Sequence, residues 1–110
     1  MAEDTASAFG ATAEVVWEDG YPVTVNHDAQ TDFAADMAEK VTPGVVRDTP
    51  PIMAGEDFSY MLNVRPGAYM MIGNGDGATV HHPMYDFNDD AIPAGCSWFA
   101  EMVETRLPSN

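Results

Sequence analysis

Hydrophobic residues recur at every third or fourth position between Asp28 and Val41, with polar residues between them. The apolar positions of this stripe are Phe33, Met37 and Val41, with Ala34 and Ala38 beside them. This spacing predicts a helix with one buried face. Asn26 or Asp28 can cap its start, and the turn-forming residues 42–44 end it.

Two shorter segments also have helical character. Residues 2–9 are rich in alanine, and Gly10 stands where a helix commonly stops. Glu56 and Asp57 would lie in the first turn of a short helix that runs through Leu62, where negative charge opposes the positive end of the helix dipole.

The most regular helical pattern lies at the end of the chain. Asn88 or Asp89 can cap this helix, and Pro93 is tolerated in its first turn. The apolar residues that we expect on its buried stripe are Ile92, Cys96, Phe99, Val103 and Leu107.

Other segments predict strands. Residues 13–17 alternate in the manner of a half-buried strand, and residues 21–25 continue extended, as an edge because Pro22 cannot donate to a ladder. Val45–Val46 is a candidate for a short strand. The unbroken apolar run 68–72 is typical of a strand covered on both faces. With about three helices and three to four strands, the sequence predicts a mixed α/β fold.

Charge and composition limit the partners. The 18 acidic residues against four basic ones give a net charge of −14, which would repel a phosphate backbone or an anionic membrane. Cys96 is the single cysteine, so no internal disulfide can form. No apolar run approaches the roughly 20 residues that span a bilayer, and the first residues lack a signal-peptide pattern, so we expect a cytoplasmic protein.

Residues that can carry chemistry gather between residues 51 and 90. This stretch contains the acid pair Glu56 and Asp57, a glycine-rich loop that starts at Gly73, and the histidines His81 and His82 before a proline. Imidazoles are common metal ligands, although a loop histidine is more often an ordinary surface residue. The loop lacks the lysine and Ser/Thr of a phosphate-binding loop, which favours a plain turn.

Three consecutive segments of this stretch together resemble a known family. They read GEDFSYML, then RPGAYMMIGNG, then HHPMYDFNDDAIPAG. In order and residues they resemble the C-terminal portion of metal-dependent amidohydrolases of the hippurate-hydrolase and auxin-conjugate-hydrolase type, within the zinc aminoacylase and carboxypeptidase superfamily. The earlier segment FGATAEVVWEDGYPVTVNHD looks like the end of the smaller lid domain of that family.

The resemblance implies an organisation in two parts. Residues 1–41 would hold the end of a lid domain that often mediates dimer contacts, followed by a return helix. Residues 42–110 would form the C-terminal part of a metal-binding α/β/α sandwich.

The resemblance also implies roles for particular residues. His81 matches the family histidine that binds one of two metal ions, zinc or manganese, whereas His82 stands where the family usually has a small polar residue. The substrate-pocket candidates are Asn26, Glu56, Asp57, Gly73, Asn74 and His82. Two metal ions suit amide hydrolysis because they polarise the carbonyl and lower the pKa of a bridging water toward ~7. The family's other ligands and its general base come from an N-terminal motif that this sequence lacks.

We therefore expect a C-terminal fragment of a two-metal amidohydrolase that cleaves N-acyl amino acids or related small-molecule amides and is inactive alone. It would form a homo-oligomer or associate with the missing N-terminal part, because a solitary strand at 68–72 would expose apolar surface. The alternative is a non-catalytic binding or assembly module stabilised by oligomerisation. A third, weaker interpretation is an acidic metal-binding protein.

Overall fold

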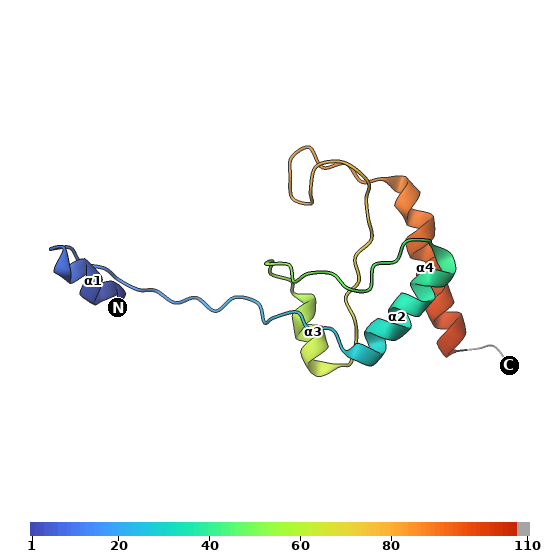
Figure 1. Ribbon diagram of the computed structural model, residues 1–110, viewed down its shortest axis with the longest axis horizontal. Coiled ribbons are helices and arrows are strands. Elements are labelled where there is room, and N and C mark those ends of the chain that lie inside the picture. The colour runs from blue at the N-terminus through green and yellow to red at the C-terminus, as the bar shows by residue number, and fades with distance from the viewer. Residues whose placement is uncertain (108–110) are drawn as a thin grey trace.

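The computed structural model describes residues 1–107, which form four α-helices and one 3₁₀ helix joined by long extended segments (Figure 1). The elements in order are α1 (Ala2–Ala8), α2 (Asp28–Val41), α3 (Phe58–Val64), η1 (Asp89–Ala91) and α4 (Ile92–Arg106). No β-strand forms within the described range, so the predicted α/β class with three to four strands is wrong. The last residues of the predicted second part, 108–110, lie outside the described residues.

The predicted strands fail because a strand exists only when a neighbour pairs with its backbone. Residues 13–17, 21–25, 45–46 and 68–72 run outside helices, but no ladder joins any two of them. At Tyr69 a side chain, not a neighbouring strand, pairs with the backbone. Its backbone N–H and C=O both pair with the side chain of Asn26, at 2.7 and 3.0 Å.

The segments predicted as helices do form helices. α2 begins and ends where the sequence indicated, and its inner face buries Ala34, Ala35 and Met37. Of the predicted stripe, Ala34 and Met37 are thus buried, whereas Phe33, Ala38 and Val41 are only half-buried. α1 ends at Ala8 just before Gly10, whose φ of 70° is a conformation that glycine adopts without strain. α3 (Phe58–Val64) forms too, but Glu56 and Asp57 precede it and do not lie in its first turn as predicted; Asp57 is its N-cap residue.

α2 and α4 pack side by side and form the body of the molecule (Figure 1). The Trp98 indole N–H reaches across from α4 and donates to the Ala34 carbonyl oxygen at 2.8 Å. The Arg106 guanidinium stacks over the Phe33 ring at 4.3 Å, a cation–π contact. Lys40 and Glu101 pair at the surface between the two helices.

The outer face of α4 differs from the prediction. We expected Ile92, Cys96, Phe99, Val103 and Leu107 to be buried, yet all five side chains are exposed. α2 packs against the neighbouring face that carries Trp98 instead. The helix itself forms as predicted, but the predicted burial of this stripe is wrong for the described residues.

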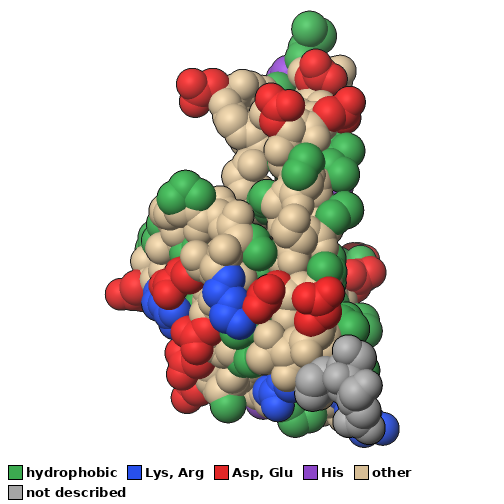
Figure 2. Space-filling model, turned by 90° about the vertical axis from the view of Figure 1, so that its right-hand side faces the viewer, with side chains coloured by type: hydrophobic (Ala, Val, Ile, Leu, Met, Phe, Trp, Pro, Cys, Tyr) green, Lys and Arg blue, Asp and Glu red, His purple; other side chains and the backbone are tan. Residues whose placement is uncertain are grey.

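The shape explains why so much apolar surface is exposed. The radius of gyration is 20.5 Å, against about 13 Å for a compact chain of this length. The accessible surface is 9383 Å², against roughly 6,000 Å² for a folded monomer of this mass. α1 stands at the end of an extended arm that projects from the body (Figure 1), and apolar side chains reach the surface over much of the face in Figure 2. Within residues 1–107, no helix has the length and apolarity to cross a membrane.

Candidate functional site

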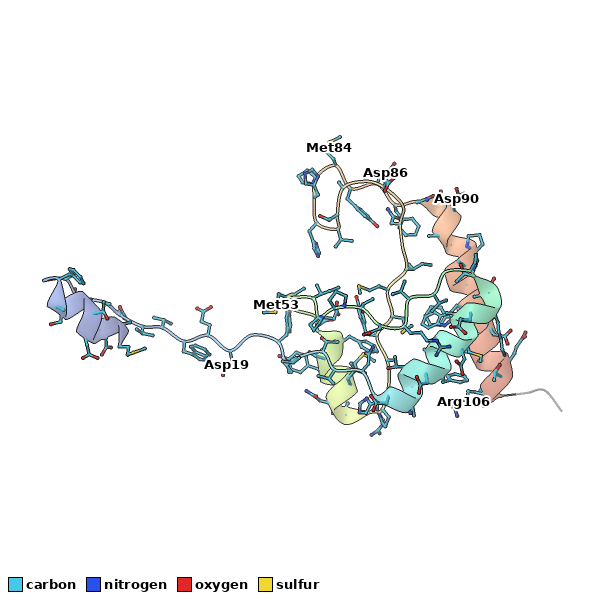
Figure 3. All side chains as sticks on the ribbon, in the orientation of Figure 1. Asp19, Met53, Met84, Asp86, Asp90 and Arg106 are labelled. Atoms are coloured by element: carbon cyan, nitrogen blue, oxygen red, sulfur yellow. The ribbon has the colours of Figure 1, made fainter. Side chains whose placement is uncertain are left out.

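The loop from residue 73 to residue 89 lines a cavity of about 490 Å³. The residues that line it include three acidic ones, Asp76, Asp86 and Asp89, and two apolar ones, Met84 and Phe87. Figure 3 shows this loop, with Met84 and Asp86, standing clear of the helices. Such a wall offers oxygen acceptors beside an apolar surface.

Asn74 joins the two ends of this loop. Its side-chain Nδ2 donates to the Asp86 carbonyl oxygen at 2.8 Å, and its Oδ1 accepts from the Asn88 backbone N–H at 2.8 Å. Asn88 in turn caps η1 by accepting from the Asp90 backbone N–H at 3.0 Å, whereas the N-cap residue of the last helix, for which Asn88 or Asp89 was predicted, is Ala91. One carboxamide therefore connects the glycine-rich segment to the start of the last helix.

The two histidines lie at the tip of the same loop, and both are exposed. His82 Nδ1 accepts a hydrogen bond from the Met84 backbone N–H at 3.0 Å, which occupies that nitrogen's lone pair and places the ring proton on Nε2. The His81 ring makes no hydrogen bond with any described residue. His81 is also the one described non-glycine residue with a positive φ, 68°. Of the two imidazoles, that of His81 has both nitrogens available.

A second group of candidates surrounds Tyr69. Asn26 holds the Tyr69 backbone, and Glu56 interacts with the Tyr69 side chain. The pKa of Glu56 lies below its ordinary value, first because the Phe58 backbone N–H donates to the carboxylate at 3.1 Å and then because of the Tyr69 hydroxyl. The same contact raises the pKa of Tyr69, chiefly because the phenol donates to the carboxylate. The two pKa shifts thus have one common cause, the interaction between the Glu56 carboxylate and the Tyr69 hydroxyl.

The candidate residues thus form two groups. Gly73, Asn74, His81 and His82 belong to the loop, whereas Asn26 and Glu56 meet at Tyr69, with Asp57 as the N-cap residue of α3. In residues 1–107, no three His, Cys, Asp or Glu side chains come together in a way that could hold a metal ion. The described residues therefore do not fit a complete metal centre of their own.

Tyr69 was missed by the sequence analysis. It lies inside the apolar run 68–72 and was interpreted there as part of a strand core. Its side chain is 39% exposed and contacts the Phe58 ring at 5.5 Å between ring centres. A hydroxyl inside an apolar run was the signal that could have identified it, because the polar end of a tyrosine is not expected in the interior of a strand core.

Comparison with known families gives one family match. The model described as Peptidase family M20/M25/M40 matches residues 3–105, nearly the whole chain. No solved structure matches the chain significantly.

Individual relatives agree with the family match. The N-acetyl-L-cysteine deacetylase of Bacillus subtilis is 33% identical over all of this chain and 26% of its own length. The putative amidohydrolase YhaA of the same organism is 39% identical over 78% of this chain and 23% of its own length. The hippurate hydrolase of Campylobacter jejuni is 30% identical over 74% and 22% of the respective lengths. The chain therefore spans about a quarter of the length of these relatives.

Proposed function

Because the chain belongs to peptidase family M20/M25/M40, we propose that it forms the C-terminal portion of a metal-dependent amidohydrolase acting on N-acyl amino acids or related amides. The observation that carries the proposal is the match over residues 3–105 together with relatives named as deacetylases and hydrolases of N-acyl compounds. In this proposal residues 1–41 form the end of the lid domain and the return helix, and residues 42–110 belong to the C-terminal part of the metal-binding catalytic domain.

We assign His81 as the one metal ligand that this chain contributes, to zinc or manganese. Two features support His81 over His82. The His81 ring is free of hydrogen bonds to the described residues, whereas His82 Nδ1 is already occupied by the Met84 N–H. Because residues 1–107 gather no further ligands, the remaining ligands and the general base would come from another polypeptide portion, and the chain alone would be inactive.

The loop around Asn74 and the group around Tyr69 would contribute walls of the substrate site. Asn74 fixes the glycine-rich segment against Asp86 and Asn88, so Gly73 lies beside a firmly held backbone. Asn26 and Glu56 are both engaged with Tyr69, which supports a positioning role for them. Asp57 and His82 remain candidates for the rim of the pocket.

A chimaeric enzyme tests the proposal. The matched C-terminal quarter of the Bacillus subtilis N-acetyl-L-cysteine deacetylase would be replaced by this whole chain, and hydrolysis of N-acetyl-L-cysteine would be measured with zinc or manganese. We expect turnover by the chimaera and none by the isolated chain on N-acetyl or N-benzoyl amino acids. A folded chimaera without activity would contradict the proposal.

Two variants of the chimaera form a matched pair for the metal ligand. His81→Ala should lower activity by more than the roughly 10–100-fold that loss of a supporting residue costs at metal sites. His82→Ala should retain most of it. Equal losses in both variants would refute the assignment of His81.

The exposed apolar surface favours a second candidate function, a non-catalytic assembly module that forms homo-oligomers. The accessible surface is 9383 Å², and the apolar residues Ile92, Phe99 and Val103 of α4 are exposed. Light scattering of the isolated chain tests this candidate, which requires a dimer or larger oligomer. A stable monomer at micromolar concentration would argue against it.

A further inference from the structure

Asn74 precedes Gly75, and this dipeptide carries chemistry that the hydrolase proposal does not use. Asparagine is among the thermolabile residues. Its side-chain carbonyl carbon, Cγ, can be attacked by the backbone nitrogen of the next residue, and glycine presents that nitrogen without a Cβ to hinder it. The sequence Gly73–Asn74–Gly75–Asp76–Gly77 places such a pair in the middle of the loop.

The surroundings leave this reaction open. Asn74 is half-buried and Gly75 is exposed. The Gly75 backbone N–H donates to no acceptor among residues 1–107, so no hydrogen bond has to break before it reacts. Only the Asn74 side chain is restrained, by its bonds to Asp86 and Asn88.

We propose that Asn74 is a spontaneous deamidation site whose conversion releases the connection between the two ends of the 73–89 loop. The Gly75 nitrogen loses its proton to solvent and forms a bond to Asn74 Cγ. Nδ2 takes up a proton from solvent, the bond from Cγ to Nδ2 breaks, and ammonia leaves. Water then opens the resulting succinimide at either carbonyl and gives aspartate or isoaspartate.

The product cannot make the same contacts. A carboxylate at position 74 has no donor for the Asp86 carbonyl oxygen, which Nδ2 now contacts at 2.8 Å. Two acceptor oxygens would face each other there. The new negative charge would also lie in a wall that already carries Asp76, Asp86 and Asp89. In isoaspartate the main chain gains a methylene, which shifts the side chain away from Asn88.

The covalent step is tested by ageing the unmodified whole protein at neutral pH and mapping its peptides by mass spectrometry. Deamidation adds about 1 Da, and isoaspartate is distinguished by its elution. Asn63 is the internal control, because it is exposed but precedes the branched Val64. We expect Asn74 to convert roughly tenfold faster than Asn63, with both products present. Equal conversion at the two positions would overturn the proposal.

The structural step is tested with Asn74→Asp and the matched variant Asn63→Asp, which adds the same charge on α3. Hydrogen exchange at the Asn88 backbone N–H, which now donates to Asn74, is the readout. We expect exchange to accelerate about fivefold to tenfold in Asn74→Asp and to stay unchanged in Asn63→Asp. Unchanged protection in Asn74→Asp would show that deamidation leaves the loop intact. Neither measurement depends on hydrolase activity.

Discussion

The Asn26 carboxamide takes the place of a neighbouring strand for Tyr69. Its Nδ2 donates to the Tyr69 carbonyl oxygen at 3.0 Å, and the Tyr69 N–H donates to its Oδ1 at 2.7 Å. These two contacts, with the backbone bond from His27 N–H to the Gly67 carbonyl oxygen at 3.0 Å, attach the start of α2 to the segment after α3.

Removal of the Asn26 carboxamide should therefore free Tyr69. We expect Asn26→Ala to lose about 1–2 kcal/mol of local stability, because two backbone groups lose their partners at once. The rate of hydrogen exchange at the Tyr69 backbone N–H measures this loss of local stability. Thr24→Ala is the control, since that hydroxyl makes only a 3.4 Å contact to the Glu56 carbonyl oxygen. Equal acceleration in both variants would contradict the assigned role of Asn26.

The backbone conformation of His81 should lower the stability of the folded chain. Its φ of 68° is unfavourable for a residue with a Cβ, so His81→Gly should raise the free energy of unfolding by up to about 1 kcal/mol. Urea denaturation measures the change. His82→Gly should be destabilising instead, because it removes the acceptor for the Met84 N–H. A loss of stability in His81→Gly would show that the imidazole makes a stabilising contact.

Glu56 should make the stability of the folded chain depend on pH. Its pKa is lowered in the folded chain, first by the Phe58 N–H, so the unfolded chain binds the proton more tightly. The stabilisation is present above the ordinary value of 4.5 and is lost as the pH falls through the lower folded value. Denaturation midpoints measured between about pH 3 and pH 6 should show a shallower slope for Glu56→Gln than for the unmodified protein.

Glu104→Gln is the matched control for this titration, because Glu104 makes no hydrogen bond with a described residue. The slope of Glu56→Gln should be shallower than the slope of this control. If the stability of Glu56→Gln changed with pH as steeply as that of the unmodified protein, the Phe58 and Tyr69 contacts would not persist in solution.

Trp98 should hold the two long helices together. Trp98→Phe removes the 2.8 Å bond to the Ala34 carbonyl oxygen while keeping an aromatic ring, and we expect a loss of about 1 kcal/mol. Thermal unfolding followed by helical circular dichroism measures the loss. Phe99→Leu is the control, because Phe99 is 61% exposed and should tolerate the change. If Phe99→Leu lost as much stability as Trp98→Phe, Phe99 would be covered in solution, as an oligomer would require.

The sequence by itself determined the features that depend on residues close together in the chain. The α2 stripe of Phe33, Met37 and Val41, the Asn88 cap and the family motifs of residues 55–95 could all be read locally. A helix satisfies its own backbone, so its pattern is sufficient to predict it.

Tertiary structure decided everything that needs a partner distant in sequence. The run 68–72 has the composition of a buried strand, but no strand pairs with it in residues 1–107, and Tyr69 pairs with the Asn26 side chain instead. Only the fold showed that the Asn74 side chain bonds to the backbone of both Asp86 and Asn88. Only the fold showed, likewise, that the His82 ring accepts a hydrogen bond while the His81 ring makes none with the described residues. Pairing of this kind depends on where the chain brings distant groups, which the order of residues does not state.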